Sequence, residues 1–352
     1  MTFFRNNIDA MTGYEPGEQP AAGVKVIKLN TNENPYPPSP AVVRAVHAFD
    51  PELLRRYPDP MARAACRAAA EALGVPADCV LAGNGSDDLL TIVFRACLGE
   101  GRIVTYPTPT YVLYQTLAKI QNAPFVEVPY PEDYALPFDA LRGVRAAVTI
   151  VANPNSPSGT LVPLEQMEKL AAAVAGVLVI DEAYADFAEG NALSLVAKFP
   201  NVVVLRTLSK GYSLAGLRMG FAFAQPTLLD GLNKVKDSYN VDAIACAAAA
   251  AAMKDQPWKN ANAEKVKASR AKLSADLAAM GFKVWPSQSN FVLARPPRGN
   301  ASEIYQALKA AGILVRYFNQ PRLDDKLRIS IGTEEQNAEL IGAIKKILDP
   351  RS

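Results

Sequence analysis

The chain has 352 residues, of which 49% are hydrophobic, so it can bury a large core and still carry a smaller second domain. A formal net charge of +2 argues against nucleic acid or another polyanion as a partner. The N-terminus lacks an apolar stretch behind a basic start, and the longest small-apolar run, Ala243–Met253, is too short to span a bilayer. We therefore expect a cytoplasmic protein without a membrane partner, in which that run forms a packed helix.

The number and spacing of the cysteine and histidine residues disfavour several kinds of metal and catalytic site. The four cysteines are scattered without a C-x-x-C pair, so neither a zinc site nor a disulfide framework is indicated, and we expect no metal. The one histidine, His47, lies in the helical pattern Pro40–Phe49, which disfavours Ser-His or Cys-His catalysis.

Composition shifts divide the chain into three parts. Residues 1–36 are polar and proline-dotted, and we expect them to form an N-terminal arm and loop that belong to the small domain. The stretch Asn30–Pro38, which begins within them, reads as an extended loop because each proline biases its predecessor away from helix. Residues 37–255 form the expected large domain, and residues 256–352 a small C-terminal α+β domain.

The large domain shows strands that alternate with helices. Continuous apolar strands separated by helices predict an α/β fold with a mainly parallel sheet covered on both faces. Ligands of such sheets bind at the carboxyl ends of the strands. The seven strand candidates are Val80–Ala82, Ile103–Tyr106, Phe125–Val128, Ala147–Val151, Val177–Ile180, Val202–Leu205 and Met219–Phe223, with helices at Pro60–Leu73, Ser86–Leu98, Tyr111–Gln121 and Leu164–Val174 among others.

The C-terminal part has a different pattern of predicted helices and strands. A long helix, Pro257–Met280, precedes short strands and two further helices, which is typical of an α+β domain. The expected strands are Phe282–Trp285, Asn290–Ala294, Ile313–Val315 and Leu327–Ile331, and the expected helices lie near Ser302–Ala311 and Glu334–Leu348.

The first chemical motif follows the first strand, where a glycine turn leads into a helix that begins near Ser86 and Asp87. Free backbone N–H groups at such a helix start bind anions. The alternative is a capped helix whose acidic residues complement its dipole. Neither the complete dinucleotide fingerprint nor a P-loop lysine is present.

Two further strand ends offer an aromatic ring and amides. Tyr111 follows the second strand and could stack on a planar ring or simply pack at a helix start. Asn153–Thr160, a proline-rich turn that contains Asn155 and Ser156, ends the fourth.

Asp181 ends a buried strand, with Tyr184 three residues later. A carboxylate there needs a partner, which a protonated pyridine nitrogen would supply. A magnesium-binding acid is the alternative, although no phosphate loop accompanies it.

The stretch with the most candidate site residues is Thr207–Gly220, where Thr207 and Ser209 precede Lys210 and Arg218 follows. A lysine amine can form a Schiff base with a carbonyl cofactor, while hydroxyls and a guanidinium hold its phosphate. An ordinary surface loop is the alternative for an isolated Ser-Lys pair. Far downstream, Arg328 could be a salt-bridge partner or capture a carboxylate with two of its guanidinium nitrogens.

Together these motifs resemble fold-type I pyridoxal-phosphate aminotransferases, most closely the histidinol-phosphate aminotransferase family, from about Asn30 to Gly332. The resemblance implies pyridoxal 5'-phosphate as cofactor, a seven-stranded large domain and a homodimer with shared sites. Lys210 would carry the cofactor and shuttle the proton, Asp181 would pair with the pyridine nitrogen and Tyr184 with the ring oxygen. The remaining cofactor-binding residues would be Ser86, Asp87, Tyr111, Thr207, Ser209 and Arg218, with Tyr57 reaching over from the neighbouring subunit.

One position departs from the family pattern. The second asparagine of the usual Asn-Asn-Pro-Thr-Gly motif is Ser156 here, and we expect Asn155 to take over its contact with the cofactor ring oxygen. The substrates implied by the resemblance are a phosphorylated amino alcohol, histidinol phosphate, and the pair 2-oxoglutarate and glutamate. Arg316 and Arg328 would grip their anionic groups, with Asn34 and Tyr14 as further contacts.

Other functions remain possible at this point. An aromatic-amino-acid aminotransferase or an O-phospho-amino-acid decarboxylase could use the same scaffold. A non-catalytic binding module is the alternative of another class, which the intact Lys210 disfavours. A nicotinamide dehydrogenase is disfavoured by the missing fingerprint.

Overall fold

The computed structural model describes residues 3–13, 18, 20, 23 and 26–349. Its core element is a seven-stranded sheet in the order β2-β8-β7-β6-β5-β3-β4, in which only β8 runs antiparallel to its neighbours. All seven expected strands are present, and the predicted mainly parallel sheet is confirmed. Their bounds are β2 (Val80–Gly83), β3 (Val104–Thr108), β4 (Phe125–Pro129), β5 (Val148–Ala152), β6 (Val177–Asp181), β7 (Val202–Thr207) and β8 (Gly220–Phe223).

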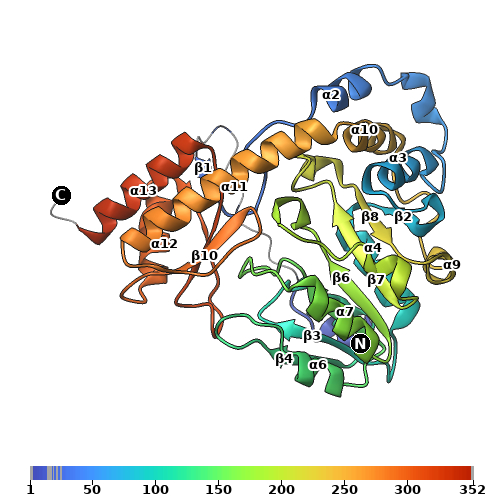
Figure 1. The fold of residues 1–352 in the computed structure, drawn as a ribbon, viewed down its shortest axis with the longest axis horizontal. Helices are drawn as coiled ribbons and strands as arrows, with labels where there is room; N and C mark the ends of the chain where they lie inside the picture. The colour runs from blue at the N-terminus through green and yellow to red at the C-terminus, as the bar shows by residue number, and fades with distance from the viewer. Residues whose placement is uncertain (1–2, 14–17, 19, 21–22, 24–25, 350–352) are drawn as a thin grey trace.

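Helices cover both faces of this sheet, as Figure 1 shows. Along β6, Leu178 and Ile180 pack into one hydrophobic cluster and Val179 into the other, because successive strand side chains point to opposite faces. The first cluster includes α2 (Pro40–His47), α3 (Arg63–Leu73), α6 (Phe138–Gly143), α7 (Leu164–Ala173), α8 (Leu195–Lys198) and α10 (Ala243–Lys254), and the second includes α4 (Gly85–Cys97), α5 (Leu113–Ile120) and α9 (Pro226–Asn233).

The C-terminal part packs around its own hydrophobic cluster. An antiparallel sheet in the order β12-β13-β10-β9 is covered by the long α11 (Gln256–Ala279), α12 (Ala301–Ala310) and α13 (Glu334–Leu348), seen at the left of Figure 1. Its strands are β9 (Lys283–Val284), β10 (Phe291–Arg295), β12 (Arg316–Tyr317) and β13 (Leu327–Ser330).

The chain near Ile313 differs from the expected single strand. β11 (Ile313–Leu314) pairs in parallel with β1 (Ile27–Lys28), and the chain then moves to the other sheet as β12. The short β1 was not predicted, and it ties the arm to the C-terminal part. A further N-terminal helix, α1 (Asn6–Asp9), lies against the end of α5 through hydrogen bonds of Asn7.

None of the helices in the described part of the chain has the length and apolar character needed to cross a bilayer. The alanine-rich run forms α10, which packs against α3 and α2 as expected for a buried helix.

Candidate active site

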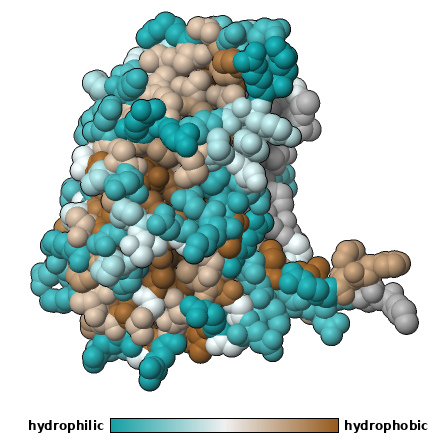
Figure 2. All heavy atoms as spheres, turned by 90° about the vertical axis from the view of Figure 1, so that its right-hand side faces the viewer, coloured by the Kyte–Doolittle hydropathy of each residue, from teal (hydrophilic) through white to brown (hydrophobic). Residues whose placement is uncertain are grey.

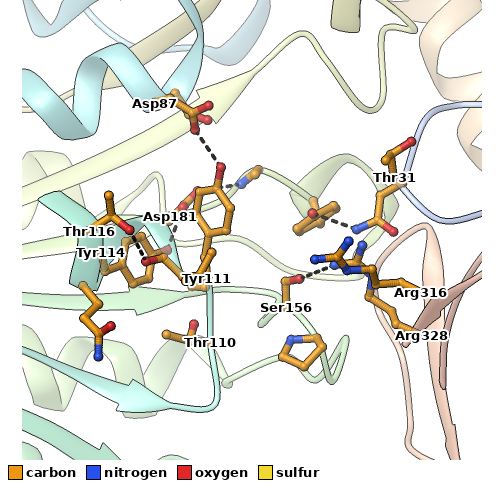
Figure 3. Close-up of a pocket in the computed structure, with 18 of the residues that line it drawn as sticks. Thr31, Asp87, Thr110, Tyr111, Tyr114, Thr116, Ser156, Asp181, Arg316 and Arg328 are labelled. Atoms are coloured by element: carbon orange, nitrogen blue, oxygen red, sulfur yellow. Dashed lines mark hydrogen bonds between the residues drawn. The ribbon is translucent and has the colours of Figure 1, made fainter. Parts of the chain in front are cut away.

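A cavity of about 530 Å³ lies between the carboxyl edge of the large sheet and the C-terminal part. Parallel strands deliver their last residues to this edge, where Ala152 pairs with Asp181 and Asp181 with Leu205. The cavity brings together most of the candidates named from the sequence, and Figure 3 shows part of its lining. These lining candidates are Ser86, Asp87, Tyr111, Asp181, Tyr184, Thr207, Ser209, Lys210, Arg218, Arg316 and Arg328.

One end of the cavity is an anion cradle made by the start of α4 and by Thr207, Ser209 and Arg218. The Thr207 hydroxyl donates to Ser209 Oγ at 3.0 Å, and the Arg218 guanidinium donates to Ser209 Oγ at 3.4 Å. Helix N–H groups, two hydroxyls and a guanidinium are donors suited to a phosphate ester.

Gly85 is required in this cradle for two reasons. Its φ of +82° favours glycine, and a Cβ there would lie 2.7 Å from the Arg218 guanidinium nitrogen Nη2. The backbone of the helix start and the guanidinium therefore approach each other only because this position has no side chain.

Asp87 organises the cradle through its carboxylate. The carboxylate accepts from the Tyr111 hydroxyl at 3.2 Å and from Arg218 at 3.4 Å. A carboxylate repels a phosphate, so only the backbone N–H of Asp87 suits direct phosphate binding. The side chain instead orients Tyr111 and Arg218, as Figure 3 shows for the tyrosine.

Asp181 lies at the bottom of the cavity and is 5% exposed. Its carboxylate accepts from the Tyr114 hydroxyl at 2.7 Å and from the Ala183 N–H at 3.2 Å. Burial raises the pKa of this carboxyl from its ordinary value of 3.8 to about 6, although both hydrogen bonds favour the ionised form. The site therefore suits a ligand that brings a positive charge to this carboxylate.

Tyr114 was not among the sequence candidates, because a buried tyrosine inside a helix is usually a packing residue. Its side chain is completely buried, and its ring meets those of Tyr106 and Tyr111. The available signal was its position in the first turn of α5, three residues after the candidate Tyr111, whose ring it contacts.

Lys210 follows β7, and its Nζ donates to the backbone oxygen of Thr31 at 3.3 Å. The same nitrogen lies 5.9 Å from the centroid of the Tyr184 ring. The lysine is therefore held inside the cavity by the loop at Asn30–Asn34, close to the candidate tyrosine. Its amine has the orientation that a Schiff-base lysine needs, because it faces the interior of the site.

The structure does not support a substrate contact from the side chain of Asn34. Its amide donates to the backbone oxygens of Lys210 and Gly211, at 3.0 and 3.4 Å, and it does not line the cavity. Asn34 thus fixes the backbone of the lysine. The neighbours Thr31 and Asn32 line the cavity instead, and Asn32 donates to the Tyr184 hydroxyl at 3.0 Å.

The structure does not support the preference for Asn155 over Ser156. Asn155 is 1% exposed and turned away from the cavity, since its amide oxygen accepts from Thr110 at 2.8 Å and its nitrogen donates to Ser158 and to the Pro109 oxygen. Ser156 lines the cavity and accepts from Arg328 at 3.2 Å.

Arg316 and Arg328 form the opposite wall. They are directly paired residues of β12 and β13, so their side chains leave the same face of the sheet. Both guanidinium groups lie beside the Phe318 ring, at 5.2 and 5.5 Å from its centroid. Arg328 also donates to the Asn30 oxygen at 2.9 Å. Figure 3 shows the two guanidinium groups close together, an arrangement suited to an anion.

Two candidates lie elsewhere. Tyr57 is 82% exposed, stacks on Tyr239 with the ring centroids 4.5 Å apart, and does not line the cavity of its own chain. Tyr14 lies outside the described residues.

A model of the family described as aminotransferase class I and II matches residues 24–344. The chain belongs to this family. Among aminotransferase sequences, it is 57% identical over 346 residues to histidinol-phosphate aminotransferase 1 of Trichormus variabilis, with 98% of this chain and 99% of the relative covered. It is 50% identical to the histidinol-phosphate aminotransferase of Rhodopirellula baltica, with 95% and 92% covered.

The aminotransferase fold is found in a solved structure of similar size. Histidinol-phosphate aminotransferase from Sinorhizobium meliloti, in complex with pyridoxal-5'-phosphate, has a TM-score of 0.90 and 26% identity. The match covers 100% of this chain and 99% of that one. The resemblance to fold-type I aminotransferases expected from the sequence is thereby confirmed.

Proposed function

We propose that this chain is a pyridoxal-phosphate-dependent aminotransferase that transfers the amino group of histidinol phosphate to 2-oxoglutarate. The observation that carries the proposal is the arrangement of one cavity: an anion cradle, a buried carboxylate, an inward lysine amine and a pair of arginines. The names of the relatives at 57% and 50% identity support the choice of substrate.

The residues present fit pyridoxal phosphate. The cradle of α4, Ser86, Thr207, Ser209 and Arg218 suits its phosphate, with Gly85 leaving the necessary room. Asp181, whose pKa is raised to about 6 by burial, suits a positively charged ring nitrogen. When bound, the cofactor supplies an electron-withdrawing ring that accepts the electron pair of the substrate Cα–H bond.

The protein contributes orientation and proton transfer. Tyr111 and Tyr184 flank the space in which the ring would lie, and the arginines would set the angle of the substrate Cα–H bond by holding its far end. Lys210 Nζ would take the proton from the substrate Cα and deliver it to the cofactor carbon C4′. General-base catalysis of this kind is typically worth ~10²–10⁴-fold in rate.

Two guanidinium groups suit the donor and the acceptor in turn. A phosphate monoester carries more negative charge than a carboxylate at neutral pH, and a second cation beside Arg328 favours it. We assign Arg316 mainly to the phosphate of histidinol phosphate, and Arg328 to the phosphate and to a carboxylate of glutamate.

We also propose a homodimer in which Tyr57 reaches the cradle of the partner. The support is its 82% exposure, beside the exposed Leu53, Leu54 and Met61 of the same segment. This segment lies on the side of the molecule viewed in Figure 2, where hydrophobic residues alternate with polar ones. An exposed hydrophobic cluster of this kind is typical of an interface.

An amino-donor screen tests the proposed reaction. Purified protein with pyridoxal phosphate and 2-oxoglutarate is offered histidinol phosphate, phenylalanine, tyrosine or O-phosphothreonine, and glutamate and carbon dioxide are measured. We expect glutamate formation with kcat/KM highest for histidinol phosphate. A higher value for an aromatic amino acid would contradict the donor assignment. Carbon dioxide release from O-phosphothreonine, with no glutamate formed from any donor, would contradict transamination itself.

A further inference from the structure

The two cavity arginines belong to one hairpin, residues 316–328, which we call the arginine hairpin. Its base is the β12–β13 pair, in which Arg316 lies opposite Arg328. Beyond this base the chain leaves the small sheet, and Phe318, Gln320 and Leu323 line the cavity. The hairpin therefore carries a whole wall of the site.

The tip of this hairpin is fastened to the large sheet by Arg322. The guanidinium of Arg322 donates through Nη1 to the Thr108 oxygen at 3.1 Å and through Nη2 to the Tyr130 oxygen. Thr108 ends β3, three residues before Tyr111, and Tyr130 directly follows β4. One planar group thus joins the substrate wall to the strand ends on the cofactor side.

The backbone conformation of Arg322 indicates that the contacts of this residue hold the tip of the hairpin in place. Its φ is +72°, in the left-handed region that a side-chain-bearing residue rarely adopts. Such a conformation persists only where the surroundings over-determine it. Here Lys326 Nζ donates to the Arg322 oxygen at 2.8 Å, the adjacent Leu323 is buried, and the guanidinium makes its two bonds.

We propose that Arg322 is a positioning residue that seats the arginine hairpin so that Arg316 and Arg328 face the cofactor side of the cavity. The inference rests on the proposed function for the role of those arginines. Without the guanidinium, the hairpin would adopt this position in only a fraction of the molecules. The apparent dissociation constant for substrate would then equal the intrinsic one divided by that fraction. Once substrate is bound the hairpin is seated, so kcat is retained.

The test compares Arg322→Gln and Arg322→Lys with the control Arg298→Gln, an exposed arginine of the same C-terminal part. We expect Arg322→Gln to raise KM for both substrates about tenfold, with kcat within twofold of wild type and an unchanged cofactor absorption band. Arg322→Lys should be intermediate, because an amine lacks the planar fork that reaches both carbonyl oxygens. The control should behave as wild type. If Arg322→Gln does not fold, Arg322→Lys carries the same comparison.

Hydrogen exchange of the loaded protein gives a readout that does not depend on turnover. Residues 318–326 and 108–111 should exchange faster in Arg322→Gln than in wild type, and inorganic phosphate should restore part of the protection. Unchanged exchange together with unchanged KM would overturn the proposal, as would a loss of kcat at unchanged KM. If the wild type did not transaminate at all, the proposed function would fail while the exchange result still decided whether Arg322 seats the hairpin.

Discussion

Asp181 is a buried residue whose ionised carboxylate would be stabilised by a positively charged ligand. Its carboxylate is buried, is held by the Tyr114 hydroxyl and the Ala183 N–H, and has a pKa raised to about 6. A cationic ring nitrogen beside it would favour the ionised form that burial disfavours. The residue is thus arranged for a charged partner, and the cofactor-free protein bears the cost of burial.

That cost predicts a pH dependence of stability. Between the ordinary pKa of 3.8 and about 6, folded cofactor-free protein binds more protons at Asp181 than unfolded protein does, so its free energy of unfolding falls as pH rises through this window. Asp181→Asn should remove this contribution, on the order of 3 kcal/mol over the window. Denaturant unfolding of both proteins from pH 4 to 7 measures it, and parallel curves would contradict the pKa of Asp181.

Arg316 makes a second prediction possible at this scale. Because a phosphate monoester needs more positive charge than a carboxylate, Arg316→Ala should lower kcat/KM for histidinol phosphate more than for glutamate, by about tenfold in the ratio. Arg328→Ala, the matched comparison, should harm both substrates. Steady-state kinetics in each half-reaction measures the ratio, and equal losses in Arg316→Ala would refute its phosphate role.

Single residues also show which parts of the site could not be predicted from the sequence. The meeting of Lys210, Asp181 and Arg218 in one cavity could be predicted because strand ends converge on one edge of a parallel sheet. The choice between Asn155 and Ser156 could not be made from the sequence, because it depends on which way a turn faces, and the buried partners of Asn155 are visible only in three dimensions. Tyr114 and Asn32 were missed because their roles come from hydrogen bonds to other candidates.

At the scale of elements, the start of α4 is the part on which the anion cradle depends. Gly85→Ala would place a methyl group 2.7 Å from Arg218 Nη2, and we expect the affinity for pyridoxal phosphate to fall at least tenfold. Gly74→Ala is the control, since Gly74 also has a positive φ, of +68°, but nothing lies within 4 Å of its added Cβ. Equilibrium titration of the cofactor measures both. Equal affinities in the two variants would show that Gly85 does not shape the cradle.

The strands of the large sheet could be predicted because buried parallel strands are continuous apolar runs with clear ends. The reversed direction of β8 could not, since periodicity carries no information on direction. In this region one strand was predicted, Ile313–Val315, because that run is uniformly apolar. It corresponds to β11, whereas β12 was not predicted, because the change of sheet at Arg316 follows from pairing with β1 and β13. Strand existence is a local property, whereas pairing is not.

At the scale of the whole molecule, the proposed homodimer makes complementation possible. Tyr57→Ala and Lys210→Ala should each have low activity, and a mixed dimer should regain one complete site, because Lys210 of one protomer would meet Tyr57 of the other. Activity is measured after the two variants exchange subunits, with each variant alone as control. If both residues served the same chain, mixing would restore nothing.

The central claim is that Lys210 carries the cofactor in this cavity. The most direct measurement is peptide mapping after borohydride reduction of the protein loaded with pyridoxal phosphate, which fixes the cofactor to the amine that holds it. We predict a single cofactor-labelled peptide, the one that contains Lys210, and loss of the label in Lys210→Ala. A label on another lysine, or no label at all in the wild type, would contradict this account.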